Sequence, residues 1–237
     1  MSDQRPGSRP VGLLVAGVLL AAAIAGFLAH RLTTSAPPLA GAPEKVAASK
    51  VEAQSAPAGT PNSRTHPIPE QLPPIALPDR RGATRRLTDW QGKPLLINFW
   101  ATWCEPCRRE IPLLKTLRRE HSADGLEVVG IAIDHLDAVQ QYAADHGIDY
   151  PVLIGEERGL AAASAFGMEV VLPFSVFADH SGRIVALKVG ELHRDEAELI
   201  LRRVHDVDTG RLSLPAARTE ISDGLRRLSV ARVASGG

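Results

Sequence analysis

The chain has 237 residues, enough for one full domain with extensions or for two small domains. Its 27 basic residues balance its 27 acidic ones. It therefore lacks the positive excess of a general nucleic-acid binder, and no nucleic-acid partner is expected. Two cysteines are too few for a disulfide-rich scaffold. Nine of the ten aromatic residues lie between Trp90 and Phe177, so we expect the folded core there.

The N-terminus combines a short basic stretch with a long apolar one. Residues 1–10 carry two arginines and one acid, and residues 11–29 contain no charged side chain. As a helix, this run would span about 28 Å, close to the hydrocarbon core of a bilayer. Because a positive flank stays in the cytoplasm, we expect residues 11–30 to anchor the chain once in the cytoplasmic (inner) membrane, with the C-terminal part in the periplasm. The alternative is a signal peptide cleaved after the A-I-A of residues 23–25; both place the later domain in an oxidising compartment.

Residues 31–66 have the composition of a linker. They are rich in alanine, proline, serine and threonine and contain no aromatic residue. Such a segment cannot bury enough apolar surface to offset the entropy of ordering it. We expect a disordered tether that holds a domain of residues 67–208 away from the membrane, followed by a C-terminal extension of residues 209–237.

The order of apolar runs and turns predicts an α/β domain. A turn-rich stretch at residues 78–82 predicts a first hairpin, and residues 179–182 predict a second one. Between them, the apolar run at residues 94–99 predicts a buried strand with a parallel neighbour. The expected strands are residues 75–77, 84–87, 94–99, 126–133, 150–154, 174–178 and 183–188, and the expected helices are residues 104–120, 136–146, 158–166 and 194–207. This alternation favours a mixed sheet with helices on both faces.

Both cysteines stand in the sequence W-C-E-P-C of residues 103–107, where the 94–99 strand gives way to a helix. The unpaired N–H groups and the dipole of a helix start stabilise a Cys104 thiolate, and a thiolate is the nucleophile of thiol–disulfide exchange. Pro106 fits there because the amide it lacks would be unpaired anyway. The spacing allows a disulfide, but so short a loop would stabilise the fold little. The pattern therefore favours redox chemistry.

Metal binding is the main alternative for these cysteines. A zinc site needs two more ligands, and the sequence has no second cysteine pair and no closely spaced histidine pair. Copper is harder to exclude, because thiolates suit Cu(I). We expect no metal and no cofactor other than a redox-active disulfide.

Residues 98–110, N-F-W-A-T-W-C-E-P-C-R-R-E, resemble the active-site segment of the TlpA/ResA-like thioredoxin-fold oxidoreductases. Residues 171–177 with Gly182 resemble the segment that carries the cis-proline of that fold. The similarity covers about residues 70–205. It implies a thioredoxin-like fold and a membrane-anchored thiol:disulfide oxidoreductase that faces the outside of the cytoplasmic membrane.

The resemblance implies a role for each residue near the motif. Cys104 would be the attacking cysteine and Cys107 the resolving one, joined as the redox disulfide. Pro173 would be the cis-proline opposite that disulfide. Leu172 would offer backbone groups to an extended client segment. Trp103 would pack beside the active site.

Two polar positions bear on proton transfer. Asn98 stands where many thioredoxins carry a buried acid, and an amide cannot act as a base. Glu110, three residues after Cys107, matches an acid that ResA-type members carry near the active site. A buried carboxylate there would raise the thiol pKa values and exchange a proton with them. The alternative is a surface glutamate paired with an arginine.

The sequence between the cysteines, Glu105-Pro106, and the lack of a dimerisation module resemble the reducing branch of the family. The resemblance then implies a monomer that reduces cysteine pairs of client proteins, in cytochrome c maturation or oxidase assembly, with electrons from a membrane donor of the DsbD/CcdA type. One alternative is a CcmG/DsbE-type thioredoxin, although the V-L-P-F of residues 171–174 lacks the acidic G-x-P-E-like pattern. Another is a non-enzymatic copper carrier of the Sco type, which uses C-x-x-x-C and a histidine.

The last segment predicts one more helix. Ser213 and Pro215 are typical of a helix start, and Ile221, Leu225 and Leu228 recur with helical spacing. We expect an amphipathic helix that packs on the domain, with membrane binding as the alternative.

Overall fold

The computed structural model of the chain describes residues 68–169 and 171–235. The predicted anchor at residues 11–30, its signal-peptide alternative and the tether at residues 31–66 lie outside these ranges. Among the helices within the ranges, none has the length and apolar character needed to span a bilayer.

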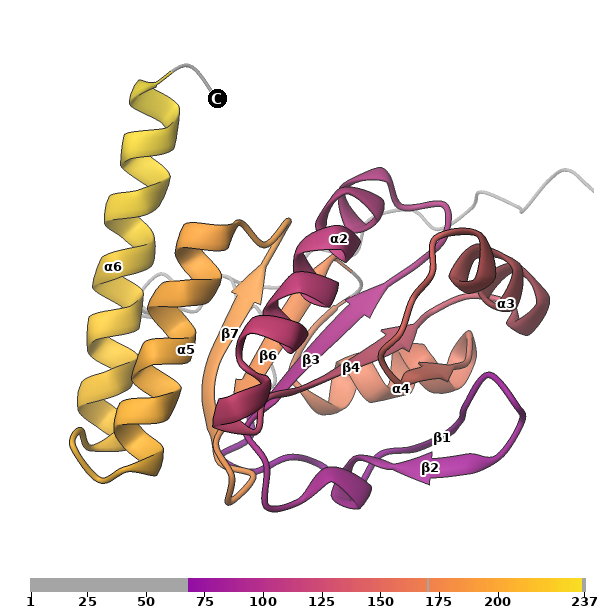
Figure 1. Cartoon of the computed structure of the whole chain (residues 1–237), viewed down its shortest axis with the longest axis horizontal. Coiled ribbons are helices and arrows are strands. Elements are labelled where there is room, and N and C mark those ends of the chain that lie inside the picture. Colours follow the sequence, from indigo (N-terminus) through magenta and orange to yellow (C-terminus); the bar gives the residue numbers. More distant parts are fainter. Residues whose placement is uncertain (1–67, 170, 236–237) are drawn as a thin grey trace, which may run out of the picture. The chain divides into compact units, whose positions relative to one another are not determined.

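A five-stranded mixed sheet forms the centre of the fold, in the strand order β5-β4-β3-β6-β7 (Figure 1). Strands β3, β4 and β5 are parallel, whereas β6 is antiparallel to β3 and β7 is antiparallel to β6. The strands are β3 (Leu95–Trp100), β4 (Glu127–Ala132), β5 (Val152–Ile154), β6 (Phe174–Ala178) and β7 (Ile184–Val189), and the preceding hairpin consists of β1 (Ala76–Pro78) and β2 (Thr84–Arg86). Both predicted hairpins and the mixed sheet are confirmed.

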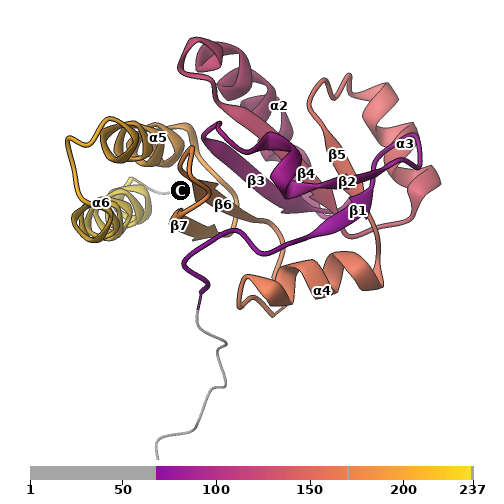
Figure 2. The same ribbon diagram turned by 90° about the horizontal axis from the view of Figure 1, so that it is seen from below.

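Helices cover both faces of this sheet (Figure 2). The helices are α2 (Glu105–Glu120), α3 (Leu136–Asp145), α4 (Glu157–Ala165), α5 (Arg194–Asp208) and α6 (Leu214–Ala234), and two 3₁₀ turns are η1 (Leu87–Trp90) and η2 (Ser122–Asp124). Helices α2, α3 and α5 contribute to one apolar cluster, and α4 with the β1–β2 hairpin contributes to the other. The observed architecture is the predicted thioredoxin-like α/β fold.

Strand β3 supplies side chains to both clusters because its residues alternate between the two faces. Leu96 and Trp100 point into the cluster under α2 and α5, while Ile97 and Phe99 point toward α4. All six β3 residues are buried, as expected for the central strand of a covered sheet. Asn98 shares the face of Leu96 and Trp100, so a polar side chain lies beneath α2.

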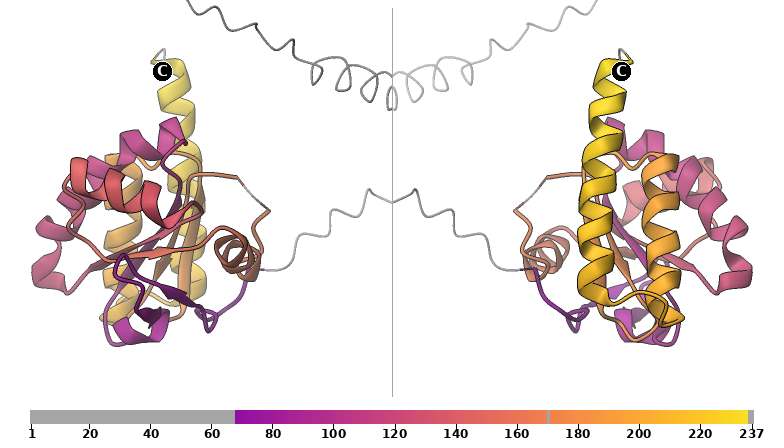
Figure 3. Two further views of the ribbon diagram at one scale, coloured as in Figure 1. Left: turned by 90° about the vertical axis from the view of Figure 1, so that its right-hand side faces the viewer. Right: turned by 90° about the vertical axis from the view of Figure 1, so that its left-hand side faces the viewer.

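Helix α6 packs alongside α5, as both views in Figure 3 show. Ser213 caps its start, with its hydroxyl accepting the Ala216 N–H, as the sequence predicts. Ala217 and Ile221 are buried, and the Arg218 side chain bonds the Ile184 carbonyl of β7. The expected packing of the last helix on the domain is therefore present, with Leu225 half-buried against the core.

Candidate active site

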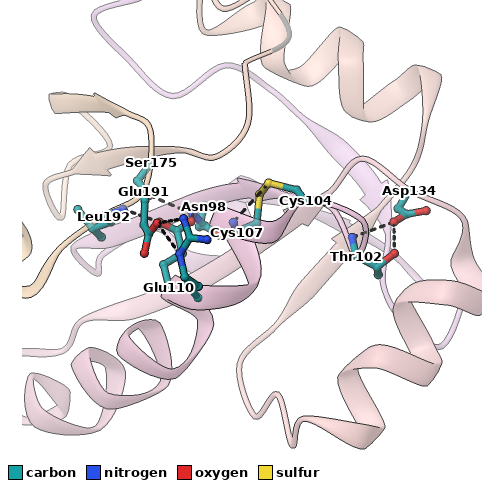
Figure 4. The surroundings of a disulfide bond; sticks show 10 residues. Asn98, Thr102, Cys104, Cys107, Glu110, Asp134, Ser175, Glu191 and Leu192 are labelled. Carbon is teal, nitrogen blue, oxygen red and sulfur yellow. Dashed lines mark hydrogen bonds and ion pairs between the residues drawn. A yellow bond between two sulfur atoms is a disulfide. The ribbon is translucent and has the colours of Figure 1, made fainter. Parts of the chain in front are cut away.

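The two cysteines lie where the central strand β3 passes into helix α2. Cys104 is the N-cap residue of α2, and a disulfide joins it to Cys107 in the first turn (Figure 4). Their Cα atoms are 5.3 Å apart, and the Cys107 N–H donates a 3.3 Å hydrogen bond to Cys104 Sγ. A helix start leaves such N–H groups without internal partners, so this one stabilises negative charge on the sulfur after reduction.

Both sulfur-bearing side chains are buried in this oxidised form. Cys104 keeps an exposed fraction of 6% and Cys107 keeps none. In the disulfide state Cys104 belongs to the apolar cluster under α2. Cys104 is still the more accessible of the two, and the neighbouring Trp103 is 67% exposed.

Asp134 fixes the backbone just before the cysteines. Its Oδ2 atom accepts hydrogen bonds from the Thr102 N–H at 2.9 Å and from the Thr102 hydroxyl at 2.6 Å (Figure 4). Parallel pairing of β3 with β4 brings the two strand ends together and places these residues side by side. Sequence reasoning missed Asp134, although an acid that directly follows a strongly apolar strand is a usable signal.

The Leu172–Pro173 peptide bond is cis, as predicted. Phe174 pairs with Phe99, so the segment before β6 and the segment after β3 meet at the same end of the sheet. Pro173 is buried, and its carbonyl accepts a 2.8 Å hydrogen bond from the Gly190 N–H. Leu172 is half-buried, and within residues 68–169 and 171–235 its backbone makes no backbone hydrogen bond.

Glu110 lies inside the fold, with an exposed fraction of 2%. Its Oε1 accepts a 2.7 Å hydrogen bond from Asn98 Nδ2, and its Oε2 accepts a 2.6 Å bond from the Leu192 N–H (Figure 4). The Asn98 amide also donates to the Ser175 hydroxyl at 3.1 Å. The alternative of a surface glutamate paired with an arginine is therefore wrong.

Burial controls the protonation of this carboxyl group. Desolvation raises the pKa of Glu110 from 4.5 to about 7, although the hydrogen bonds from Leu192 and Asn98 oppose the rise. The charge of Glu191 raises this pKa further, and that of Lys188 lowers it. A carboxyl group with a pKa near neutrality can accept and release a proton under physiological conditions.

Glu191 and Leu192 were not foreseen from the sequence. Both lie in the loop between β7 and α5, 82 residues from the α2 residues they contact. Glu191 accepts a 2.6 Å bond from Arg109 of α2, next to Glu110 in the sequence. The Leu192 contact uses a backbone N–H, which every residue except proline carries. The type of residue at this position therefore does not predict the contact.

Within the described ranges, no group of three or more histidine, cysteine, aspartate or glutamate residues is arranged to hold a metal ion.

The profile of the AhpC/TSA family matches residues 68–187. The chain belongs to this family. It is 30% identical to thiol-disulfide oxidoreductase ResA of Bacillus thuringiensis (strain Al Hakam) over 138 residues, which are 58% of this chain and 78% of that protein. It is 28% identical to ResA of Geobacillus thermodenitrificans (strain NG80-2) over 133 residues, 56% of this chain and 75% of that protein.

Solved structures of similar proteins share the fold of this AhpC/TSA-family chain. The structure of MTB dsbF in mixed oxidized and reduced forms superposes with a TM-score of 0.50 at 25% identity, over 59% of this chain and 98% of that chain. A thiol-disulfide oxidoreductase from Bacteroides fragilis NCTC 9343, at 21% identity, shares the fold with a TM-score of 0.50, over 56% of this chain and 98% of that one. The sequence-based resemblance is confirmed, and the protein is a TlpA/ResA-like thiol:disulfide oxidoreductase.

Proposed function

We propose that this oxidoreductase reduces disulfides in client proteins outside the cytoplasmic membrane, in cytochrome c maturation or cytochrome oxidase assembly. The observation that carries the proposal is the pairing of a disulfide at the start of α2 with Glu110, a buried carboxyl group one helical turn further on. The first group exchanges electrons with a client, and the second handles the accompanying proton. The ResA relatives, named thiol-disulfide oxidoreductases, support thiol–disulfide exchange as the reaction.

The reaction begins from the dithiol form. The Cys104 thiolate attacks one sulfur of the client disulfide, so a mixed disulfide forms and the other client sulfur leaves as a thiolate and takes up a proton. The position of Cys104 as N-cap supports this role, because the Cys107 N–H and the helix dipole stabilise the thiolate.

Cys107 completes the reaction. Its thiol passes a proton to the Glu110 carboxylate, and the resulting thiolate attacks Cys104 Sγ. The mixed disulfide breaks, the second client sulfur leaves as a thiolate that takes up a proton, and the enzyme is left with the disulfide described above. The client gains two electrons from the enzyme and two protons, one released again by Glu110 and one from the solvent, which received the Cys104 proton when the thiolate formed. Cys107 and Glu110 lie on neighbouring turns of the buried side of α2, which suits this transfer.

We assign client binding to Trp103, Leu172 and Pro173. Trp103 offers an exposed aromatic surface beside Cys104. The backbone of Leu172, next to the cis-peptide of Pro173, is suited to pair with an extended client segment. Backbone recognition of this kind depends little on client sequence, which fits an enzyme that serves cysteine pairs.

The membrane context is part of the proposal. Residues 11–30 would anchor the enzyme in the membrane. The enzyme would act as a monomer, and the disulfide would be its only redox group. Because each turnover leaves the disulfide behind, the enzyme needs a source of two electrons. A membrane donor of the DsbD/CcdA type would supply them by the same exchange reaction.

The reduction potential of the Cys104–Cys107 couple tests the direction of electron flow. Equilibration of the purified chain with dithiothreitol or glutathione at known ratios gives this potential. We expect a value near or below that of thioredoxin, about −270 mV. A value near that of DsbA, about −120 mV, would assign the enzyme to oxidation instead. Titration of the reduced chain with Cu(I) distinguishes the oxidoreductase from the copper-carrier alternative. A copper carrier must bind Cu(I) tightly and in stoichiometric amount.

A further inference from the structure

Three consecutive residues of the loop between β7 and α5 bond to residues around the redox site. The Gly190 N–H bonds the carbonyl of Pro173 at 2.8 Å, and the Leu192 N–H bonds Glu110 at 2.6 Å. Between them, Glu191 accepts a 2.6 Å bond from Arg109 on α2. Figure 4 shows Glu191 and Leu192 beside Glu110. A displacement of this loop would therefore reach the cis-proline and the buried carboxyl group together.

Lys188 holds the loop from the side of β7. Its ammonium group donates to the carbonyls of Val189 at 2.9 Å and Glu191 at 3.1 Å, and its side chain is only 16% exposed. A shielded ammonium group requires an anion, and Glu196 of α5 supplies it at 3.4 Å. The Glu196 carboxylate also accepts the His193 N–H at 3.1 Å, so it ties both ends of the short loop together.

The last helix completes this network. Arg232 of α6 donates to Glu196 Oε1 at 3.1 Å and to Asp195 Oδ1 at 3.0 Å. Helix α6 runs alongside α5, so its last turns reach the start of α5, where Glu196 lies (Figures 1 and 3). Glu196 therefore stands between two cations, Arg232 and Lys188, and its side chain is 3% exposed.

We propose that helix α6 positions the redox site, with Arg232 holding Glu196, Glu196 holding Lys188, and Lys188 fixing the loop that contacts Glu110 and Pro173. Lys188, Glu196 and Arg232 are thus positioning residues for the thiol–disulfide chemistry. They lie beyond residues 68–187, the part that matches the family profile. The inference rests on the proposed role of Glu110 in proton transfer.

The direction of the effect follows from the groups that face Glu110. Lys188 of β7 and the Leu192 N–H lower its pKa, whereas Glu191 of the loop raises it. Tyr150 lies just before β5. Its pKa is raised chiefly by burial and also by the charge of Glu110. When Arg232 is removed, Glu196 draws the Lys188 ammonium group away from the loop carbonyls. The loop loosens, the Leu192 hydrogen bond weakens, and the pKa of Glu110 rises.

The test compares two single-charge changes on the same helix. Arg232→Gln breaks the network, whereas Arg226→Gln removes an exposed arginine that pairs with Asp223 on its own helix. Carbon-13 NMR of the oxidised full chain follows the titration of the Glu110 carboxyl, and amide hydrogen exchange follows the Leu192 N–H. For Arg232→Gln we expect a pKa higher by about 0.5 and exchange of the Leu192 amide faster by roughly tenfold.

Arg226→Gln should leave both readouts at the wild-type values, and Arg232→Lys, which keeps the charge, should restore most of the difference. Lys188→Gln should shift both readouts in the same direction as Arg232→Gln. If Arg232→Gln matches Arg226→Gln in both readouts, the inference is overturned. Neither readout involves a client, so the direction of electron flow under the proposed function is tested independently by the reduction potential.

Discussion

At the scale of single residues, the site is defined by a difference in chemistry between two polar groups in the same buried surroundings. Asn98 and Glu110 share a hydrogen bond inside the core, but only Glu110 can take up a proton. The Asn98 amide opposes the rise in the pKa of Glu110 through its hydrogen bond but carries no charge, so burial still dominates the protonation of this carboxyl group. The acid therefore remains chemically active in a place where a salt bridge would have kept it ionised.

The two cysteines should behave differently when mutated singly. Cys104 is the N-cap residue and the more accessible of the pair, so Cys107→Ser should accumulate mixed disulfides between Cys104 and client proteins. Cys104→Ser should accumulate none, because the remaining sulfur of Cys107 is fully buried. Non-reducing electrophoresis of both variants checks this, and equal trapping would reverse the assigned roles.

Glu110→Gln should change the thiol titration. A carboxylate close to a thiol makes the thiolate less favourable, and the amide removes this repulsion with little change in shape. We expect the pKa of at least one active-site thiol to fall by about 0.5 to 1. The pH dependence of disulfide exchange should also lose its inflection near 7, the pKa of Glu110. Alkylation rates across pH measure both; a curve that overlays the wild type would place the proton route elsewhere.

The same carboxyl group should make stability depend on pH. Its pKa is 4.5 in the unfolded chain and about 7 in the folded one, so between these values the folded state holds a proton that the unfolded state has lost. The contribution to the free energy of unfolding is therefore complete below pH 4.5 and declines as the pH rises to 7, by at most about 3 kcal/mol. Guanidinium unfolding of the wild type and of Glu110→Gln at pH 4.5 and 8 isolates the contribution of Glu110 to the free energy of unfolding, because the variant has no carboxyl group to titrate at this position.

At the scale of elements, β4 depends on a residue without a side chain. A Cβ atom on Gly130 would lie 2.9 Å from Trp100 Nε1 and 3.2 Å from Tyr150 Cε2. Both aromatic rings are buried and cannot retreat without disturbing the cluster under α2. The flat surface of Gly130 is therefore what lets these rings lie directly against the sheet.

Gly130→Ala should consequently destabilise the domain by about 1–3 kcal/mol, the usual cost of overpacking a core. Gly155→Ala is the matched control, because its Cβ would meet its nearest neighbour, Leu77 Cδ2, at an ordinary 3.4 Å. Denaturant unfolding of the two variants should separate them clearly. Equal stabilities would mean that the rings over Gly130 shift without cost.

Most elements could be predicted because their signals are local. Each of these signals spans only a few adjacent positions: the apolar run of β3, the turn at residues 179–182 and the pair of cysteines. The residues that fix the site geometry are different in kind. Asp134, Leu192 and Glu196 act through partners 32, 82 and 36 residues away. Such contacts arise only when the sheet and helices have assembled, so a local pattern can mark a residue such as Asp134 but cannot identify its partner.

At the scale of the whole molecule, residues 1–29 carry the sequence pattern on which the proposed location of the redox domain rests. The positive flank and the apolar run at residues 11–29 predict an anchor with its N-terminus in the cytoplasm. An alkaline phosphatase reporter fused after residue 70 should then be active, and the protein should stay with membranes after a salt wash. Release into the soluble periplasmic fraction would indicate cleavage near residue 25 instead.

The entry of the chain into the domain lies at the far end of the sheet from the disulfide. The Leu72 N–H bonds the Gly182 carbonyl and the Ile184 N–H bonds the Glu70 carbonyl, at the start of β7. Through β6, this end of β7 lies level with Leu95, the first residue of β3, whereas the cysteines follow the last residue of that strand. A mechanical pull on the leading segment would peel these two bonds apart one at a time. Such a load would act first at the start of β7, at the opposite end of the sheet from the disulfide.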